Sequence, residues 1–377
     1  MSKTPKLRFK EFSGDWEVKK LGDECRFFSG GTPLTTNRSY YDGNIPFIRS
    51  AEISGDTTEL TISESGLNNS SAKMVQKGDL LYALYGATSG EVSISKIDGA
   101  INQAILCIKS DTLNLSFLEK ILRKNKQNII NTYLQGGQGN LSSNIVKGLK
   151  YSIPSIEEQE KIASFFSLID DKISLQGEKV EALRDYKKGM MQKIFGRELR
   201  FKDDEGRDYP EWEEKKLEDI FNFQYGQFNN NPDNGGKYPI YGANGIIGGY
   251  HEYNAEKSVI IGHMGAYAGK VLWEEKKHFV TYNGTIGKPK DNQTLIPKFG
   301  YYMLLNKNIQ KICAGSGQPF LSYNDLNKIK VICPKDILEQ EKIANFLTDL
   351  DHKIEKEQEK LDSLNEYKKG LLQQMFI

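Results

Sequence analysis

One phrase occurs twice in this chain of 377 residues. Residues 157–166 read EEQEKIASFF and residues 338–347 read LEQEKIANFL, 181 positions later. The match continues, because EALRDYKKGMMQKIF at 181–195 aligns with DSLNEYKKGLLQQMF at 362–376. A long internal repeat constrains the fold more than any other feature, since missing it mis-assigns the whole architecture. We therefore predict a chain made of two related halves.

Two further segments are matched ahead of each phrase. GGQGNLSSNIVKGLKYSIP at 136–154 aligns with GSGQPFLSYNDLNKIKVICP at 315–334, and LRFKEFSGDWEVKKLGD at 7–23 resembles LRFKDDEGRDYPEWEEKKLED at 199–219. Between these segments, residues 27–135 and 221–314 share no phrase that aligns. Two similar frames thus hold two dissimilar inserts, which indicates two ligands or two parts of one ligand.

The repeated segment is predicted to be a long helix. Ser155 and Glu158 form an S-x-x-E capping box directly after Pro154, and Asp336 is the N-cap of the second copy. Apolar residues then recur in steps of four and three, the pattern of a coiled-coil seam. The seam positions are Ile162, Phe166, Ile169, Ile173, Val180, Leu183, Met190 and Ile194 in the first copy, and Ile343, Leu347, Leu350, Ile354, Leu361, Leu364, Leu371 and Met375 in the second.

Polar residues and a glycine interrupt the seam at matching places. The polar pairs are Gln176 with Glu357 and Lys187 with Lys368. Such residues cost stability but can fix register and partner. Gly189 and Gly370 also match, and a close approach of two backbones would justify their cost of about 1 kcal/mol relative to Ala.

Each helix, with about 40 residues, would be about 60 Å long. If an internal two-fold axis relates the halves, the helices lie antiparallel and hold the inserts apart at opposite ends. The length of the helices would then set the spacing between the inserts.

Composition excludes several classes of protein. The chain is 38% hydrophobic and 27% charged, and its apolar runs are far shorter than a membrane span. The first residues have no apolar core or cleavage site, so we expect no secretion signal. Cys25, Cys107, Cys313 and Cys333 lack CxxC spacing, which fits a reducing cytoplasm without disulfides or a zinc site. With a net charge of +1, any nucleic acid must be bound by local patches.

Both inserts are predicted to be strand-rich globules with helices at 115–133 and 296–312. Their loops are rich in Asn, Gln, Thr, Tyr and single basic residues, which can contact base edges and phosphates. Such polar, glycine-rich loops can also be simple solvated turns. The candidates for DNA contact are Thr32, Thr35, Asn37, Arg38, Tyr40, Arg49, Thr88 and Ser89 in the first insert and Asn230, Tyr241, Asn244, His263, Tyr267 and Lys270 in the second, with Gln138 and Gln318 in the loop that both halves share. The last two residues could instead support the start of the long helix.

No catalytic motif is recognisable. The chain lacks the N/D-P-P-aromatic tetrapeptide of amino-methyltransferases, and the glycine-rich segment at 265–271 is one residue too short for a phosphate-binding loop and has Val271 in place of Ser or Thr. The four histidines have no metal-ligand spacing. We therefore expect neither an active site nor a metal site.

The order of these segments resembles the specificity (S) subunits of Type I restriction–modification enzymes. The resemblance covers essentially the whole chain and rests on the openers ending Trp16-Glu17 and Trp212-Glu213, GGTP at 30–33, the Gly-Gln loops, and the doubled EQEKIA phrase followed by YKKG.

The resemblance implies an α+β fold with a pseudo-two-fold internal repeat, in which two target recognition domains are joined by two long antiparallel helices. The expected boundaries are a first recognition domain at 1–154, a central spacer helix at 155–195, a second recognition domain at 196–335 and a C-terminal spacer helix at 336–377.

The resemblance also implies a function and partners. Each domain would recognise one half of a split target in double-stranded DNA, and the helices would dock two methyltransferase subunits, which restriction (translocase–nuclease) subunits then join. S-adenosylmethionine, ATP and magnesium would be bound by those partners, so that this chain carries no cofactor. The alternative is a coiled-coil interaction protein whose inserts bind protein or carbohydrate.

Overall fold

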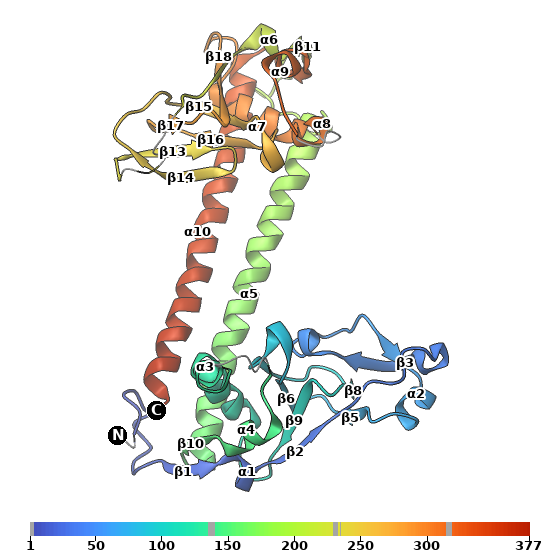
Figure 1. The fold of residues 1–377 in the computed structure, drawn as a ribbon. Coiled ribbons are helices and arrows are strands. Elements are labelled where there is room, and N and C mark those ends of the chain that lie inside the picture. The colour runs from blue at the N-terminus through green and yellow to red at the C-terminus, as the bar shows by residue number, and fades with distance from the viewer. Residues whose placement is uncertain (1–3, 135–139, 229–232, 234, 314–318) are drawn as a thin grey trace. The chain divides into compact units, whose positions relative to one another are not determined.

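The computed structural model describes residues 4–134, 140–228, 233, 235–313 and 319–377, which form two compact units. Unit 1 contains residues 1–176 and 360–377, and unit 2 contains residues 177–359. The two long helices are α5 (Ile156–Phe195) and α10 (Ile337–Met375) (Figure 1). Each of them is divided between the units, with one part in unit 1 and the other in unit 2. The described residues contain no helix with the length and apolar character that crossing a membrane requires.

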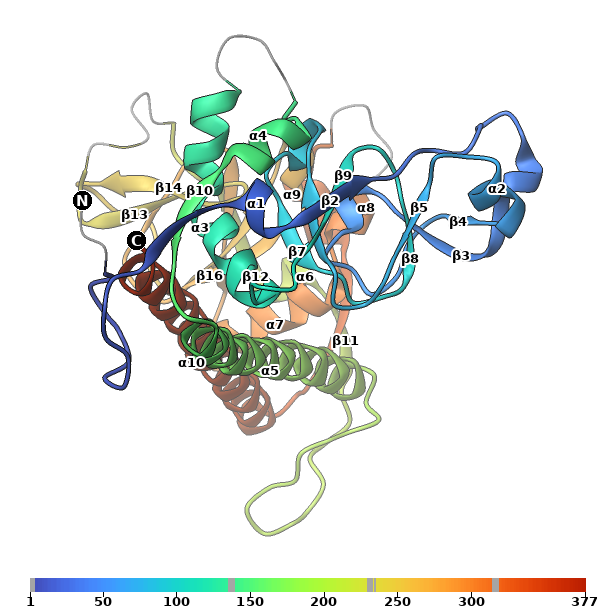
Figure 2. The ribbon, with the colours of Figure 1, turned by 90° about the horizontal axis from the view of Figure 1, so that it is seen from below.

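Unit 1 is built on two four-stranded sheets. Its first sheet has the order β2-β9-β6-β7 and is antiparallel throughout; its second has the order β4-β3-β8-β5, with β3 and β8 parallel. A separate strand pair, β1 with β10, lies beside the short helices α1 and α4 (Figure 2). The bounds are β1 (Glu17–Lys20), α1 (Leu21–Glu24), β2 (Arg26–Ser29), η1 (Arg38–Tyr40), β3 (Tyr41–Ile48), η2 (Ser50–Glu52), β4 (Thr61–Ile62), α2 (Glu64–Asn68), β5 (Lys73–Val75), β6 (Leu80–Ala83), η3 (Gly86–Thr88), β7 (Val92–Ile94), β8 (Gly99–Ile101), β9 (Ile105–Lys109), α3 (Leu115–Tyr133), α4 (Ser143–Gly148) and β10 (Lys150–Ile153).

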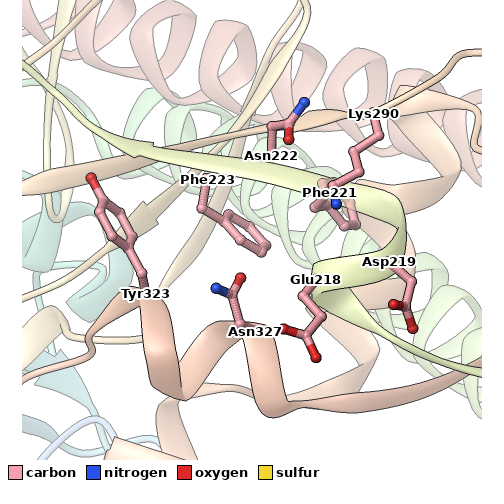
Figure 3. A pocket seen from close by; sticks show the side chains of 8 residues that line it. All are labelled: Glu218, Asp219, Phe221, Asn222, Phe223, Lys290, Tyr323 and Asn327. Atoms are coloured by element: carbon pink, nitrogen blue, oxygen red, sulfur yellow. The ribbon is translucent and has the colours of Figure 1, made fainter.

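Unit 2 repeats this plan. Its sheets have the orders β12-β18-β15-β16 and β14-β13-β17, and β11 pairs with β19 as β1 pairs with β10. Helix α6, strand β12 and helix α9 border an open cavity of about 500 Å³ (Figure 3). The bounds are β11 (Glu213–Lys216), α6 (Leu217–Ile220), β12 (Phe221–Tyr225), β13 (Tyr238–Gly242), β14 (Gly245–Tyr250), β15 (Ser258–Gly262), η4 (Gly265–Tyr267), β16 (Val271–Glu274), β17 (Phe279–Val280), β18 (Gly284–Pro289), α7 (Pro297–Lys307), α8 (Gln310–Cys313), α9 (Tyr323–Lys328) and β19 (Lys330–Cys333).

The predicted fold class is confirmed, with two strand-rich units, an internal repeat and two long helices that run antiparallel where they meet. The helix expected at 115–133 is α3, whereas the one expected at 296–312 is two helices, α7 and α8. The break lies at Asn308, whose φ of 52° is left-handed and ends α7. Asn tolerates this conformation better than most residues, which explains why the apolar pattern continued while the helix did not.

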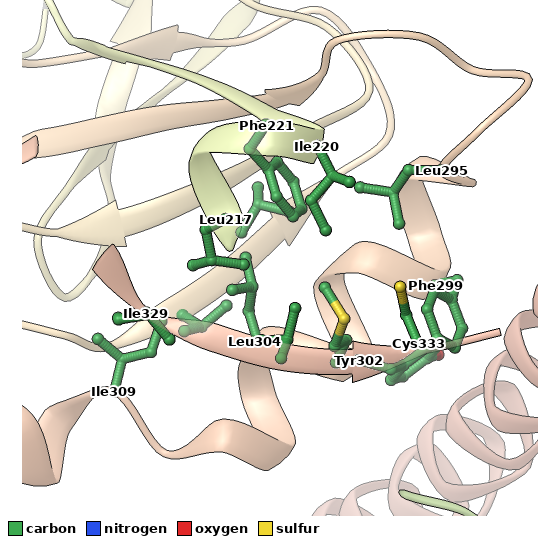
Figure 4. Packing of buried hydrophobic residues seen from close by; sticks show 14 of the residues in the cluster. Leu217, Ile220, Phe221, Leu295, Phe299, Tyr302, Leu304, Ile309, Ile329 and Cys333 are labelled. Carbon is green, nitrogen blue, oxygen red and sulfur yellow. The ribbon is translucent and has the colours of Figure 1, made fainter. Parts of the chain in front are cut away.

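The cores of both units enclose the ends of the long helices. In unit 1 the ring of Phe376, just after α10, lies 5.3 Å from Phe117 of α3 and 5.8 Å from Phe166 of α5, measured between centroids. Its counterpart in unit 2 is Phe195 at the end of α5, which lies 5.8 Å from Phe299 of α7. Figure 4 shows the core around Phe299, where α6, α7 and β19 contribute apolar side chains. In each unit, therefore, the start of one long helix packs beside the end of the other.

The repeated phrase forms a clamp at the start of each long helix. In unit 1 the guanidinium of Arg8 donates to both carboxylate oxygens of Glu158, at 2.8 and 2.7 Å. The next side chain, Gln159, accepts from the backbone N–H of Asn114 at 2.9 Å and donates to the carbonyl of Pro154 at 3.0 Å. Asn114 is the N-cap of α3, so a single Gln connects the start of α5 to the start of α3.

Unit 2 has the same clamp, to which a tryptophan adds a hydrogen bond. Arg200 donates to both oxygens of Glu339, at 3.1 and 3.0 Å, and the indole N–H of Trp212 donates to the same carboxylate at 3.1 Å. Gln340 accepts from the N–H of Ile296, the N-cap of α7, at 3.0 Å and donates to the carbonyl of Pro334 at 3.0 Å. We refer to Arg8, Glu158 and Gln159, and to Arg200, Glu339 and Gln340, as the helix-start clamps.

The predicted capping box is only half formed. The hydroxyl of Ser155 accepts from the N–H of Glu158 at 3.4 Å, while the Glu158 carboxylate binds Arg8. In the second copy the carboxylate of Asp336 accepts from the N–H of Leu338 at 2.8 Å. The glutamates therefore serve the contact with the opener segment more than the helix end itself.

The seam side chains of α5 and α10 are all buried or half-buried. Three of the four polar seam residues are ion-paired within their units: Lys187 binds Asp351, Lys368 binds Asp170, and Glu357 pairs with Lys179 at 3.0 Å. The expectation of close backbones at Gly189 and Gly370 is wrong, because a Cβ added at either position would meet nothing within 4 Å. Nothing in the structure explains these glycines.

Replacement of Glu339 by Ala should lower the free energy of unfolding by roughly 3–5 kcal/mol, because a buried charged partner is removed from Arg200 and Trp212. Urea denaturation followed by tryptophan fluorescence measures the change. Glu341→Ala is the matched control, since this carboxylate is exposed two residues further along α10 and its loss should change stability by less than about 0.5 kcal/mol. Equal losses in the two variants would contradict the clamp.

Candidate nucleic-acid interface

The inserts that share no alignable phrase share one backbone plan. Leu80 of β6 is paired with Ile108 of β9, and Val259 of β15 is paired with Gly287 of β18. Both strands of unit 2 are therefore offset from those of unit 1 by the same 179 positions (259 − 80 and 287 − 108). The inserts, dissimilar in sequence as expected, therefore share their strand pairing, because strand pairing tolerates the exchange of nearly every side chain.

In each unit a loop with two glycines follows an inner strand of the first sheet, β6 in unit 1 and β15 in unit 2; we call these two the central strands. In unit 1 it contains Gly86 and Gly90, with φ of 75° and 81°, and in unit 2 it contains Gly265 and Gly269, with φ of 75° and 82°. At Gly269 a Cβ would meet the backbone of Gln310 at 2.7 Å, so the loop presses directly on α8. These left-handed positions explain the shared pattern G-A-x-x-G-x-V, a signal that was present in the sequence and was missed.

Three predicted residues of unit 2 come together beside this loop. The ammonium of Lys270 donates to the backbone carbonyl of Asn244 at 2.8 Å and to its side-chain oxygen at 2.5 Å, and it lies 5.5 Å from the ring centroid of Tyr267. Tyr267 is 44% exposed. Because both groups that Lys270 binds are neutral, its positive charge stays available for a phosphate.

His263 lies beneath an aromatic cluster and is only 4% exposed. Its ring lies 4.6 Å from that of Tyr225, 6.0 Å from Tyr282 and 5.6 Å from Phe320, measured between centroids. Among the described residues its Nδ1 has no hydrogen-bond partner. Burial lowers the pKa of His263 below its usual 6.5, because removal from water disfavours the charged form.

The expectation that the candidates are exposed loop groups is wrong for the buried His263, and it is wrong for Ser89 and Tyr241 as well. Ser89 is 5% exposed and donates to the carbonyl of Leu84 at 3.2 Å. Tyr241 is 7% exposed and donates to the carboxylate of Glu274 at 2.8 Å, and burial raises the pKa of its phenol. Both side chains therefore form hydrogen bonds inside their own unit.

Arg49 is held by two carboxylates of its own unit. It pairs with Glu52 at 3.0 Å and also with Glu59, and the hydrogen bond to Glu52 is the main reason that the pKa of its guanidinium is raised. These ion pairs neutralise the charge of Arg49 and stabilise the loop after β3.

The remaining candidates of unit 1 are exposed or half-buried, and one of them caps a short helix. Thr32, Thr35 and Arg38 are exposed, and Tyr40 and Thr88 are half-buried. Asn37 caps η1 by accepting from the N–H of Ser39 at 3.2 Å. Gln138, Asn230 and Gln318 lie outside the described residues.

Sequence reasoning missed several exposed residues next to these candidates. They are Gln103 and Asn140 in unit 1 and Phe228, Tyr282 and Phe320 in unit 2. A large aromatic side chain in a stretch rich in Gly and Asn is the signal that could have identified the last three.

The cavity of unit 2 in Figure 3 has two acidic residues in its lining. Glu218 and Asp219 line it together with Lys290, Tyr323 and Asn327. Two carboxylates on one wall disfavour a DNA phosphate by like-charge repulsion. Among the described residues there is also no group of three or more His, Cys, Asp or Glu side chains that could hold a metal ion.

Known proteins match the whole arrangement. A family model described as the Type I restriction modification DNA specificity domain matches the chain twice, over residues 13–184 and 209–366. Among curated relatives from Methanocaldococcus jannaschii, the Type I restriction enzyme MjaVIII specificity subunit is 23% identical, with 97% of this chain and 94% of the relative covered. The MjaIX specificity subunit is 26% identical, with 95% and 92% covered.

Solved structures share the fold. The S subunit of a Type I restriction-modification system from M. genitalium has a TM-score of 0.69 at 21% identity, with 99% of each chain covered. A chain from a structure concerned with complex assembly and conformational transition of the type I R-M system has a TM-score of 0.58 at 16% identity, with 95% of this chain and 96% of that chain covered.

Replacement of His263 by Leu, the residue at the matching place in unit 1, should reduce the loss of stability in acid. The pKa of His263 is lowered in the folded state, so as pH falls below about 6.5 the unfolded state binds the proton first and gains stability. His278 acts in the same direction but is present in both proteins. Thermal unfolding at pH 7.5 and 5.5 measures the difference, and an identical pH dependence in the two proteins would refute it.

Proposed function

The chain belongs to the Type I restriction modification DNA specificity family, and on this premise we propose that unit 1 and unit 2 each recognise one half of a split DNA target. The chain is the DNA sequence-recognition subunit of a Type I restriction–modification system. The observation that carries the split target is the repeated frame itself. One backbone plan occurs twice with different side chains at its exposed loops, so each copy can contact a different set of base edges.

The chain works within a complex and has no catalytic role of its own in this proposal. Two methyltransferase subunits would dock on the paired helices, because the same helix-start clamp and the same seam occur once in each half. Restriction subunits would join this assembly. S-adenosylmethionine, ATP and magnesium would be bound by those partners, and the complex would act on DNA in the cytoplasm.

The net charge supports such a division of labour. With 51 basic and 50 acidic residues, the chain has a formal charge of +1. DNA binding depends strongly on the number of phosphates that Lys and Arg neutralise. A nearly neutral subunit would therefore need basic partners to enclose the duplex tightly, while its own loops supply the sequence preference.

Helices α5 and α10 would set the unread gap between the two half-targets. They contain 40 and 39 residues, and each is a single helix across the boundary between the two units. A continuous helix resists bending far better than a loop, so its residue count would translate into a fixed distance. The alternative, a tether whose inserts bind protein or carbohydrate, receives no support from the relatives.

The two half-targets and their gap should be visible in a map of modified adenines from cells that carry the whole system. A variant with one additional heptad in each helix, at 176/177 and at 359/360, should keep both half-targets and lengthen the gap by roughly three base pairs. Seven residues add about 10 Å of helix, and base pairs are spaced by about 3.4 Å. A variant that is active with an unchanged gap would exclude the helices as the spacer, and a continuous or absent target would exclude the proposal.

Replacement of Lys270 by Ala should weaken the binding of all DNA sequences by a similar factor, because the ammonium is placed to contact a phosphate. The slope of log K against log salt should fall by about 0.9, the value for one phosphate contact. Fluorescence anisotropy of the chain with its methyltransferase subunit measures both. Lys330→Ala is the control, since Lys330 is paired with Glu214 at 2.7 Å and its loss should leave the slope unchanged. An unchanged slope in Lys270→Ala would remove this contact.

A further inference from the structure

One position just after the central strand has the same backbone hydrogen bonds in both units but a different side chain. In unit 1, Leu84 donates its N–H to the carbonyl of Ala104 at 2.8 Å and accepts from the N–H of Leu141 at 2.9 Å. In unit 2, His263 donates to Asn283 at 3.1 Å and accepts from Leu321 at 2.8 Å. The two backbones therefore match bond for bond. Both side chains are buried, and one is aliphatic while the other is an imidazole.

A pair of exposed side chains lies next to this position in each unit. Phe27 of β2 pairs with Ile108 of β9, and Phe223 of β12 pairs with Gly287 of β18. Strand β12 therefore corresponds to β2, with an offset of 196 positions (223 − 27). Thr32 then matches Phe228, and Gln103 matches Tyr282 at the offset of 179. The pairs make contact in both units.

The two contacts have opposite chemistry. The hydroxyl of Thr32 donates to the side-chain oxygen of Gln103 at 2.8 Å, whereas the rings of Phe228 and Tyr282 lie 6.1 Å apart. The first pair is joined by a hydrogen bond and the second by an apolar ring contact. The same place on the shared backbone thus has a polar pair in unit 1 and an aromatic pair in unit 2.

A third matched position completes the set. Asn140 forms a backbone bridge with Tyr85, and Phe320 forms the corresponding bridge with Met264. We define the recognition face by these matched positions, which are Thr32, Leu84, Gln103 and Asn140 in unit 1 and Phe228, His263, Tyr282 and Phe320 in unit 2. Unit 1 presents a hydroxyl and two amides on this face, and unit 2 presents three rings.

The three rings of unit 2 are unusually accessible. Phe228 is 73% exposed, Tyr282 is 42% exposed and Phe320 is 51% exposed. Tyr282 and Phe320 both contact the ring of His263, and Phe228 contacts Tyr282, so the rings form one cluster. Tyr225 supports the cluster from beneath, since it stacks on Tyr323 at 3.9 Å and its ring lies 4.6 Å from His263. A supported group of exposed rings is typical of a binding surface.

We propose that unit 2 recognises at least one thymine of its half-target through the 5-methyl group, which Phe228, Tyr282 and Phe320 contact. The inference rests on the proposed function and adds the chemistry of one recognised base. In the major groove the thymine methyl is the one apolar group on a base edge, and aromatic or methyl side chains are its usual partners. The face of unit 1 has no such rings and would instead form hydrogen bonds.

The buried imidazole fits this assignment. A charged histidine under the rings would attract a phosphate and would bind any sequence alike. A neutral ring at that place leaves the surface apolar and confines the contact to a group that has no charge. Lys270 is held at the separate loop carbonyl of Asn244, where it can contact the backbone of the duplex.

The test uses the complete chain in complex with the methyltransferase subunit of its own system. Once the split target is known, synthetic duplexes carry deoxyuridine in place of each thymine in turn, which removes only the methyl group. At one position or more in the half-target of unit 2, binding should weaken about fourfold, the effect of losing one buried methyl. The doubly substituted chain Phe228→Ala and Tyr282→Ala should bind the thymine and uracil duplexes equally.

Two further variants keep the outcome clear. Phe228→Leu retains an apolar contact and should still prefer thymine, which shows that the methyl is recognised and not the ring alone. Leu338→Ala removes an exposed apolar side chain in the first turn of α10, outside the recognition face, and should bind as the unaltered chain does. Continued recognition of the half-target of unit 1 by every variant shows that the fold is intact.

The outcomes separate the two levels of inference. A complex that binds a split target equally well with thymine or uracil at every position overturns the thymine contact and leaves the proposed function standing. The same holds if the half-target of unit 2 contains no A·T pair, or if the doubly substituted chain still distinguishes the methyl. A complex without any split target overturns the proposed function and this inference together.

Discussion

The start of each long helix is the point on which the rest of the structure depends. A buried glutamate there binds an arginine from the segment that opens the same half, and the following glutamine accepts from the N-cap N–H of the insert helix, α3 in unit 1 and α7 in unit 2. One pair of adjacent side chains thus connects the opener, the insert and the long helix. Since a buried charge without its partner is costly, these contacts fix how each insert is attached. The doubled phrase in the sequence is the record of this attachment.

A fixed attachment leaves the rest of the insert free to vary. The pairing of the central strands is identical in the two units although almost no side chain is shared, and the glycine loops after those strands have the same left-handed positions. The exposed ends of this common backbone then differ in chemistry, with amides and a hydroxyl in unit 1 and aromatic rings in unit 2. A subunit that must recognise two unlike half-targets benefits from such a division between scaffold and surface.

Much of the scaffold could be predicted from the sequence. The seven-residue pattern indicated the long helices, and the lysines within it proved to be ion-paired seam residues. The candidate site was predicted less well. Lys270, Asn244 and Tyr267 do come together, but Ser89 and Tyr241 are buried and Arg49 is bound to two carboxylates. Composition shows that a loop is polar, but it does not show which side chains the loop uses to hold itself.

The sequence by itself determined the repeat, the helices, their seam and the family, because each of these is recorded in local spacing along the chain. Only the tertiary structure decided which insert positions are equivalent, since strand pairing joins residues far apart and permits different side chains at the same place. It also decided that Phe228, Tyr282 and Phe320 lie exposed around a buried His263. Exposure depends on what the folded chain brings next to a side chain, and no local pattern contains that information.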